Sequence, residues 1–553
     1  MELTTTVGEY LINQLYSLKV RHVFGIPGDY VLGFYDQLVK SKIKIVNTCD
    51  EQGAGFAADA YARINGLGAV CVTYCVGGLK LLNSTAQAYA EKSPVVIISG
   101  SPGIHERKKS SLLHHKIRDY DTQYNLFREV TIASTILNDI EMISSEIERV
   151  LSAAVRYSMP VYIELPRDMV YKVITSPREC IIPDLKTNHN ALKEATEESI
   201  SMINSSIKPV IVAGVEIQRF GLQNILLKLL DKTGIPFVST PLSKSVIREN
   251  HPLYLGVYEG AMGFNNVRDL VESSDCVIMF GTFMTDIDFG NSPTPVEQGK
   301  TINATSSDLS IRYHNYEDIS LRDFLLSLLD SNLLKNKKNY IKSFASLKQE
   351  TYLSNHKKND NQKITANLIF QILDNYLTSK HIIISDVGDS LFGGLDLLIK
   401  KGTEFLCPAY YLSMGFAIPA AIGAQFANER LRPIVLVGDG AFQMTGVEIS
   451  TIAKFKLNPI IVLLNNDGYR TERTILDGKF NDLYPWKYHR ITQMLNNGKS
   501  YFVKTVGQFV TALEKCNDDI QNFSLIEVSL ERFDSTDALQ RITKSLSKKA
   551  TIK

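Results

Sequence analysis

Short apolar runs alternate with amphipathic segments along the whole chain. In the first third, the runs HVFG, AVCVTY, PVVIISG and PVYIELP have the length of buried strands, and residues 7–19 have the spacing of an amphipathic helix. The second third repeats this alternation, with a helix expected over residues 221–232 and a strand over residues 276–280. Such alternation predicts parallel sheets with helices on both faces.

Two polar segments interrupt the pattern. Residues 176–196 contain Pro177 and Pro183, and residues 335–362 are polar and charged, so both are predicted to be linkers. The sequence therefore predicts an α/β protein with three doubly wound domains and mainly parallel sheets, over residues 1–180, 195–335 and 360–553.

The last third contains two apolar runs that end in chemically informative residues, VLVGDGAF and PIIVLLNN. The first run ends in Gly438, Asp439 and Gly440, and the second ends at Asn466. Parallel strands joined by a helix end at the same edge of a sheet, so Asp439 and Asn466 are expected to be neighbours. A carboxylate and an amide oxygen beside glycines suit a hard cation that also holds phosphate, although an ordinary turn would give the same GDG.

The segment between these two runs is expected to be helical. Thr445–Glu448 has the spacing of a capping box, which predicts a helix start at this point. Val447, Ile452 and Phe455 are then predicted to face the core.

Composition narrows the class of protein. The 553 residues are too many for a single core, and 44% hydrophobic and 22% charged residues are typical of a soluble globular protein. A net charge of +1 favours neither nucleic acid nor an anionic membrane as partner, and neither a membrane span nor a signal peptide is evident. Seven cysteines without zinc-ligand spacing indicate a reducing compartment, so a cytoplasmic protein is expected.

The GDG turn, the helical segment and the paired asparagines resemble the diphosphate-anchoring motif of thiamine-diphosphate enzymes. From about Thr5 to the C-terminal segment, the chain resembles one group of thiamine-diphosphate enzymes, the 2-oxo acid decarboxylases. Within this group it resembles most the phenylpyruvate and indolepyruvate decarboxylases. The resemblance implies thiamine diphosphate and Mg²⁺ as cofactors, with Asp439, Asn466 and the backbone carbonyl of Gly468 as metal ligands. It also implies a cofactor bound between two subunits, hence an obligatory homodimer and usually a homotetramer.

The same resemblance assigns catalytic residues. Glu51, in CDEQGAGFAADAYAR, matches the acid that activates the aminopyrimidine ring of the cofactor; without that match, a glutamate near a helix start would be the simpler interpretation. Asp29 in GIPGDY, His114 and His115 in SLLHH, and Glu472 in NNDGYRTER match the acid–base set. Glu472 is expected to serve decarboxylation and protonation of the intermediate, and Asp29 with His115 is expected to assist aldehyde release. Adjacent histidines are otherwise just as often structural.

Further positions would contact the cofactor. Met414 matches the bulky residue beneath the two cofactor rings, although most methionines simply pack in cores, and the backbone carbonyl of Leu412 would accept from the amino group of the cofactor. Relatives often carry glycine at the position of Leu412 and serine at that of Ala441. The remaining cofactor contacts that the resemblance implies are Thr73, Asp389, Ser390, Gly438, Asp439, Gly440, Ala441 and Asn466.

Pocket size indicates the substrate. Leu391 occupies a position where pyruvate-preferring relatives tend to have tryptophan, and Thr471 is smaller than the usual aliphatic residue; Ile475 lies on the same segment. These residues and Asp286 favour an aromatic or long branched 2-oxo acid such as phenylpyruvate or indolepyruvate, whereas Glu472 resembles the pyruvate and indolepyruvate branch. A pyruvate decarboxylase, a carboligase of the acetolactate synthase type and a non-catalytic cofactor-binding paralogue are the alternatives.

Overall fold

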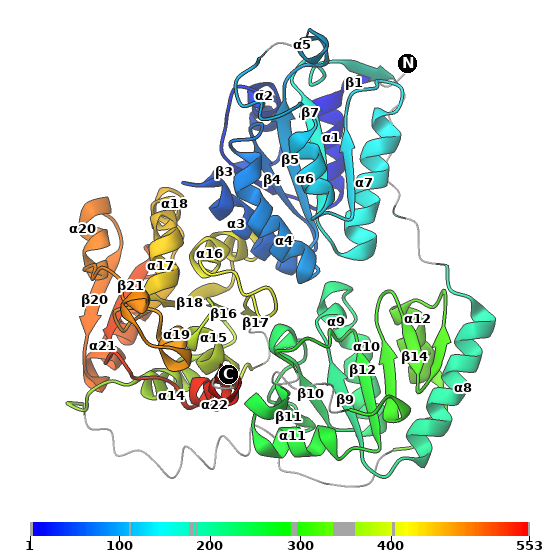
Figure 1. The fold of residues 1–553 in the computed structure, drawn as a ribbon, viewed down its shortest axis with the longest axis vertical. Coiled ribbons are helices and arrows are strands. Elements are labelled where there is room, and N and C mark those ends of the chain that lie inside the picture. Colours follow the sequence, from blue (N-terminus) through cyan, green and yellow to red (C-terminus); the bar gives the residue numbers. More distant parts are fainter. Residues whose placement is uncertain are drawn as a thin grey trace. The chain divides into compact units, whose positions relative to one another are not determined.

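The computed structural model describes residues 4–109, 112–175, 182, 186–288, 296–335, 360–400 and 404–550. Figure 1 shows three larger sheets, each flanked by helices. The α/β class with three doubly wound, mainly parallel sheets is therefore confirmed. Packing divides the chain into two compact units, one of Met1–Asp184, Tyr411–Arg430 and Met444–Leu457, the other of Leu185–Tyr410, Leu431–Gln443 and Asn458–Lys553. The domain boundaries expected from the sequence remain a prediction.

The sheet of the first unit has six parallel strands in the order β3-β2-β4-β5-β7-β6. A small antiparallel pair, β1 and β8, joins the two ends of this part of the chain. The strands are β1 Thr4–Thr6, β2 His22–Gly25, β3 Lys44–Asn47, β4 Gly68–Val72, β5 Val95–Ser101, β6 Ala133–Ile136, β7 Val161–Pro166 and β8 Val173–Thr175. The helices are α1 Val7–Ser17, α2 Leu32–Lys40, α3 Glu51–Asn65, α4 Leu82–Ala90, α5 Ile104–Lys108, α6 Thr122–Arg128 and α7 Ile143–Tyr157.

Two helices from much later in the sequence complete this unit, α16 (Ala417–Ala427) and α18 (Ile449–Lys454). Helix α16 packs along α3, and both helices are rich in alanine and glycine, so their backbones approach closely. Phe56 of α3 meets Phe416 edge to face, with ring centroids 5.8 Å apart. The face of α3 that carries Phe56 and Ala57 is thus buried by a segment more than 350 residues away.

The second unit contains a seven-stranded sheet in the order β11-β10-β9-β12-β13-β14-β15. Its first five strands are parallel and the last two are antiparallel additions. The strands are β9 Pro209–Ala213, β10 Phe237–Ser239, β11 Tyr254–Val257, β12 Cys276–Phe280, β13 Thr301–Ala304, β14 Leu309–Ile311 and β15 His314–Tyr316. The helices are α8 His189–Ser205, α9 Glu216–Arg219, α10 Gln223–Thr233, α11 Asn265–Glu272 and α12 Leu321–Asp330.

The second unit also contains a six-stranded parallel sheet in the order β17-β16-β18-β19-β21-β20. Its strands are β16 His381–Ser385, β17 Glu404–Leu406, β18 Arg432–Gly438, β19 Ile460–Asn465, β20 Lys499–Val503 and β21 Ser524–Ser529. The associated helices are α14 Ala366–Tyr376, α15 Asp389–Leu395, α17 Asp439–Thr445, α19 Arg470–Ile475, α20 Ile491–Leu495, α21 Val506–Asp518 and α22 Asp537–Ala550.

Two local predictions were wrong. The predicted linker over residues 176–196 is helical from His189 onward, because Asn188 caps α8 by accepting from the N–H groups of Asn190 and Ala191. Thr445 and Glu448 do not form a capping box, since α17 already starts at Asp439 and the Thr445 hydroxyl donates to the Gly415 carbonyl.

Other expectations had mixed outcomes. Val447 is 60% exposed rather than buried, whereas Ile452 is buried as predicted.

Most of the second predicted linker, residues 336–359, lies outside the described residues. In the described part of the chain, no helix combines the length and the apolar character needed to span a membrane.

Candidate active site

Glu51 is the first residue of α3, and the residues before it fix its position. The Asp50 carboxylate caps the helix by accepting from the Gln52 N–H at 2.8 Å. The Glu51 side chain is almost completely buried, and its carboxylate accepts from the Lys80 ammonium at 3.0 Å. Lys80 also pairs with Asp50. The Glu51 carboxyl group is therefore held in a fixed position at the start of α3.

A second carboxylate holds the turn that leads into α3. Glu448 is fully buried and accepts from the backbone N–H groups of Cys49 (3.1 Å) and Asp50 (3.0 Å), and from the Thr451 hydroxyl (2.7 Å). Burial raises the pKa of this carboxyl. A Cβ on Gly53 would lie 2.3 Å from Glu448 Oε1, so glycine permits this approach. Sequence reasoning missed this role, because the two partners are about 400 positions apart.

Asp29, His114 and His115 form a cluster in the first unit. The His114 Nε2 atom is 2.7 Å from a carboxylate oxygen of Asp29, and the rings of the two histidines meet edge to face. One ligand-type atom from each of the three residues lies within 4.8 Å of the others. His115 Nδ1 is buried with no hydrogen-bond partner among the described residues. The structure thus brings together three of the five predicted catalytic residues.

Thr73 lies next to Glu51. A Cβ placed on Gly77 would be 3.0 Å from the Thr73 carbonyl and 3.3 Å from Glu51 Oε1. The Thr73 hydroxyl is buried and has no partner within the described chain. An unpaired buried hydroxyl is costly, so this group suits a polar contact with a bound molecule.

Leu412 and Met414 lie in the loop that precedes α16. The loop is anchored by a hydrogen bond of 2.7 Å from the Asn83 amide to the Ser413 hydroxyl, and by the Tyr411 N–H, which donates to Glu91. Leu412 has a φ of 59°, a left-handed conformation that is unusual for leucine. Glycine would adopt this conformation without steric strain, so Leu412 bears a local strain that a glycine at this position would not.

The GDG turn and the paired asparagines meet at one edge of the third sheet, as predicted. Gly438 and Leu464 are in register on β18 and β19, and the Gly468 N–H donates to Asp439 Oδ2 at 2.9 Å. The Gly440 N–H donates to Asp439 Oδ1, also at 2.9 Å. Burial raises the pKa of Asp439 to about 7.

These residues fit a diphosphate held through a divalent cation. The Asn466 Oδ1 atom is buried and has no hydrogen-bond partner among the described residues, which leaves an acceptor free for a metal. The buried Asp439 carboxylate would be stabilised by a positive ion in place of water. A Cβ on Gly438 would meet no atom within 4 Å, so there is open space beside the turn, and Ala441 is buried in the first turn of α17.

Gly468 has a backbone conformation that requires glycine. Its φ is 150°, and a Cβ would lie 2.1 Å from the Asn481 carbonyl. The Arg473 guanidinium braces this loop by donating to the carbonyls of Asn466 (2.8 Å) and Asp467 (2.5 Å). Sequence reasoning missed Arg473, which lies next to the predicted catalytic Glu472.

Asp389 and Ser390 begin α15 and are engaged by their own chain. The Asp389 carboxylate accepts from the backbone N–H and the hydroxyl of Thr536, and burial raises the pKa of this acid to about 6. The Ser390 hydroxyl donates to the carbonyls of Asp386 and Val387. Direct side-chain contact of these two residues with cofactor remains a prediction.

The residues predicted to line the substrate pocket lie in the second unit. Leu391 is fully buried in α15 and its N–H donates to the Gly388 carbonyl, while a Cβ on Gly388 would be 3.3 Å from the Thr471 hydroxyl. Thr471 therefore lies beside the glycine that precedes α15, the helix whose third residue is Leu391. Glu472, which is exposed, and Ile475 lie with Thr471 on α19. Asp286 is exposed in a turn after β12.

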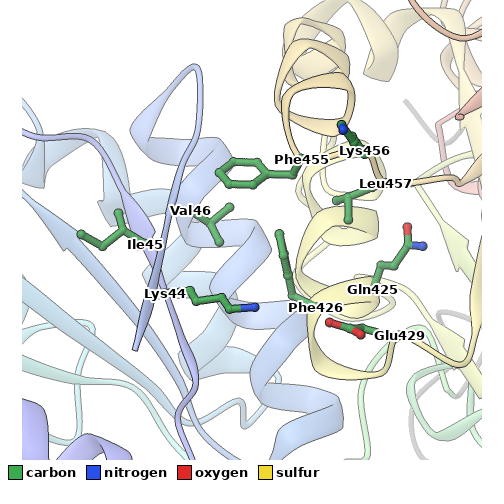
Figure 2. Close-up of a pocket in the computed structure, with 9 residues that line it drawn as sticks. All are labelled: Lys44, Ile45, Val46, Gln425, Phe426, Glu429, Phe455, Lys456 and Leu457. Carbon is green, nitrogen blue, oxygen red and sulfur yellow. The ribbon is translucent and has the colours of Figure 1, made fainter. Parts of the chain in front are cut away.

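A cavity of about 430 Å³ lies elsewhere in the first unit (Figure 2). Lys44 and Val46 of β3 face Phe426 and Phe455 across it. Its lining includes none of the residues predicted for catalysis or cofactor binding. The lining residues are Lys44, Ile45, Val46, Gln425, Phe426, Glu429, Phe455, Lys456 and Leu457.

Comparison with protein families gives three consecutive matches. Residues 5–125 match the N-terminal TPP binding domain of thiamine pyrophosphate enzymes, residues 196–329 match their central domain, and residues 386–528 match their C-terminal TPP binding domain. The cofactor class predicted from the sequence is thereby confirmed.

Several characterised proteins are similar over nearly the whole chain. The chain is 30% identical to pyruvate decarboxylase 2 of Arabidopsis thaliana over 97% of its own length and 90% of that protein. It is 31% identical to a pyruvate decarboxylase of Aspergillus fumigatus over 97% of its own length and 95% of the relative. Identity to an indole-3-pyruvate decarboxylase of Azospirillum brasilense is 33% over 97% of each chain. The chain therefore belongs to the thiamine-diphosphate-dependent 2-oxo acid decarboxylases.

Proposed function

We propose that this enzyme converts an aromatic or long branched 2-oxo acid, such as indolepyruvate or phenylpyruvate, into an aldehyde and CO₂. The observation that carries the substrate class is that leucine and threonine, rather than larger side chains, stand at positions 391 and 471, with the Thr471 hydroxyl beside Gly388 at the start of α15. The similarity to a relative named indole-3-pyruvate decarboxylase supports the same choice. A few methylene groups change binding in an apolar pocket by only about 1–3 kcal/mol, so the preference is expected to be graded.

The metal site is proposed from the GDG edge of the third sheet. Asp439, Asn466 and the carbonyl of Gly468 would hold Mg²⁺, which would in turn bind the diphosphate. The orphaned Asn466 oxygen and the buried Asp439 carboxylate support this assignment. When bound, thiamine diphosphate supplies a carbon nucleophile for the oxo group and accepts the electrons left as CO₂ departs.

Glu51 is proposed to hydrogen-bond the pyrimidine ring, with Thr73 beside it and Leu412 offering its carbonyl to the amino group. Met414 would support the bent cofactor from below. The burial of Glu51 at a capped helix start supports a fixed position for this acid. A carboxyl that does not need to reorient can exchange its proton with the ring at low cost.

The remaining proton transfers are proposed for Glu472 and for the cluster of Asp29, His114 and His115. Glu472 would serve decarboxylation and protonation of the intermediate, and Asp29 with His115 would assist aldehyde release. The 2.7 Å contact between Asp29 and His114 supports proton exchange within the cluster.

The active site is proposed to form between two copies of the chain, so a homodimer would be required and a homotetramer is expected. The expected cytoplasmic location is supported by cysteines that form no disulfide within the described part of the chain, namely Cys49, Cys71, Cys75, Cys276 and Cys516.

The test is a series of kcat/KM values for indolepyruvate, phenylpyruvate, 4-methyl-2-oxopentanoate and pyruvate, with and without thiamine diphosphate and Mg²⁺. We expect CO₂ release to require both additions, and the aromatic acids to have the highest kcat/KM. A clear preference for pyruvate would refute the pocket argument and favour pyruvate decarboxylation, the activity in the names of two relatives above. Acetolactate in place of free aldehyde would indicate a carboligase.

A further inference from the structure

Arg167 follows directly after β7 and contacts the loop that carries Asp29. Its backbone N–H donates to the Ser101 carbonyl at the end of β5, which fixes the start of the side chain. Its guanidinium Nη1 lies 3.8 Å from Asp29 Oδ2. The guanidinium is also 5.0 Å from the centre of the Tyr30 ring, within cation–π range.

The other side of Arg167 is clamped by Glu106 of α5. The guanidinium donates to both carboxylate oxygens of Glu106, with Nε 3.0 Å from Oε2, and the Gly103 N–H donates to the same carboxylate at 2.7 Å. These hydrogen bonds lower the pKa of Glu106 and raise the pKa of Arg167, so both remain charged across the working pH range. A planar guanidinium held at two points is restricted in orientation, which a lysine ammonium would not be.

Tyr30 links this clamp to His114. The two rings stack with centroids 4.7 Å apart at an angle of 22°, and the Tyr30 hydroxyl donates to the His114 carbonyl at 3.2 Å. Arg167 therefore contacts Asp29 directly and contacts the support of His114 through Tyr30. Within the described chain, the charged and titratable groups that face this pair are Arg167, Glu106, Tyr30 and His115.

An exposed ion pair contributes little to folding, and Arg167 and Asp29 are each about 40% exposed. A contribution to folding stability therefore does not explain why the Arg167 guanidinium is held by the Glu106 carboxylate and also lies next to the Asp29 carboxylate. Its fixed charge attracts the Asp29 carboxylate and so holds that side chain against the His114 ring.

We propose that Arg167, clamped by Glu106 and stacked on Tyr30, is a positioning residue that holds the Asp29–His114 pair in its reactive arrangement; this rests on the catalytic role proposed above for that pair. Arg167 need not touch the substrate. It acts by fixing the carboxylate of Asp29 and, through Tyr30, the plane of the His114 ring.

The test compares Arg167→Met, Arg167→Lys and Glu106→Gln in the holoenzyme, with Arg149→Met as the matched control. Arg149 is a half-exposed arginine paired with Glu146 on α7, away from the cluster. We expect Arg167→Met to lower kcat roughly 10- to 100-fold with a smaller change in KM, because misplacing a catalytic group by about 1 Å has costs of that size. Arg167→Lys should recover only part of kcat, because the charge returns but the planar fork does not.

Asp29→Asn and His114→Ala separate failure of this proposal from failure of the proposed function. If both lower kcat while Arg167→Met keeps the kcat and KM of the wild type, the positioning role is refuted and the pair remains catalytic. If Asp29→Asn and His114→Ala also retain full activity, the proposed function of the pair fails and the positioning role fails with it. Supporting results are a loss in Arg167→Met at unchanged melting temperature, a smaller loss in Glu106→Gln, and less than additive effects in the Arg167→Met/Asp29→Asn double variant.

Discussion

The backbone N–H of Gly468 donates a 2.9 Å hydrogen bond to the carboxylate of Asp439. This bond joins the turn after β18 to the turn after β19, so two of the proposed metal ligands are fixed by the backbone itself. Asp439 is buried with its pKa raised to about 7, which leaves a carboxylate whose negative charge is poorly solvated in the protein alone.

The first prediction concerns Mg²⁺ and pH. A carboxyl whose pKa is higher in the folded chain than in the unfolded chain contributes stability fully below about pH 4, and that contribution is lost as the pH rises through about 7. A cation bound to the ionised carboxylate offsets this loss. We therefore expect the rise in Tm on adding Mg²⁺ with thiamine diphosphate to be larger at about pH 8 than at about pH 5.5.

Asp439→Asn is the control for this prediction, because it removes the titrating group and keeps the shape. The difference between the two pH values should largely disappear in this variant, and the Mg²⁺ concentration for half-maximal activity should rise at least about tenfold. Equal Tm shifts at both pH values in the unmodified protein would contradict a role for Asp439 as a metal ligand.

The second prediction concerns Glu51. Replacing this carboxyl with the neutral amide in Glu51→Gln is expected to lower kcat by roughly 10²- to 10⁴-fold, because a positioned acid–base group contributes that much. The melting temperature should change little, since the amide keeps the shape of the side chain. The exposed Glu141→Gln, in the turn before α7, is the matched control and should keep full activity. Unchanged turnover of Glu51→Gln would refute the mechanism given above.

The third prediction concerns Glu448. Glu448→Ala leaves the backbone N–H groups of Cys49 and Asp50 without their acceptor and is expected to cost about 1–3 kcal/mol of stability. Glu448→Gln should cost less, because an amide oxygen still accepts and burial already disfavours the charged form, as the raised pKa of Glu448 indicates. Urea unfolding measures both variants. Equal stability of Glu448→Ala and the unmodified protein would show that this carboxylate does not hold the turn before Glu51.

The fourth prediction concerns the left-handed backbone at Leu412. Leu412→Gly removes a strain of about 1 kcal/mol and adds a comparable entropic cost, so stability and thiamine diphosphate affinity should stay close to those of the unmodified protein. Leu412→Val places a β-branched residue at a φ of 59° and should destabilise the loop more than Leu412→Gly does. Calorimetric titration with thiamine diphosphate and a thermal melt test both variants. Weaker cofactor binding by the glycine variant than by the valine variant would contradict this expectation.

The fifth prediction concerns substrate preference. Leu391→Trp introduces a large ring into the first turn of α15, where Leu391 is proposed to line the substrate pocket, which should lower kcat/KM for phenylpyruvate at least about tenfold relative to pyruvate. Leu391 is fully buried, so a tryptophan at this position could also destabilise the protein by overpacking. The variant should therefore keep its activity on pyruvate and its melting temperature, which would show that the fold is intact. An unchanged ratio between the two substrates would place the substrate pocket elsewhere.

Local signals predicted much of the fold. The strand over Cys276–Phe280 and the helix over Gln223–Thr233 were recognisable from an apolar run and from an amphipathic pattern. Asp439 and Asn466 could be placed together because the edge of a parallel sheet follows from the order of its strands.

The contacts that were missed depend on long-range packing. Glu448 was interpreted as the end of a capping box, since nothing near it in the sequence reveals that it binds the backbone of Cys49 and Asp50. Val447 appeared apolar and internal but is exposed, and it lies in a separate short 3-10 turn, Gly446–Glu448, not in the helix that the sequence predicted. Tyr30, Glu106 and Arg167 carry no motif of their own, and only the fold brings them around Asp29 and His114.

The packing of α16 against α3 has a consequence for biosynthesis. The amino-terminal unit includes Tyr411–Arg430 and Met444–Leu457, so a ribosome that has finished the first 184 residues has not yet made the helices that cover α3. At ordinary elongation rates these helices emerge roughly half a minute later. During that interval α3 lacks the helix that packs along it, so the amino-terminal unit can be completed only after Leu457 has been made.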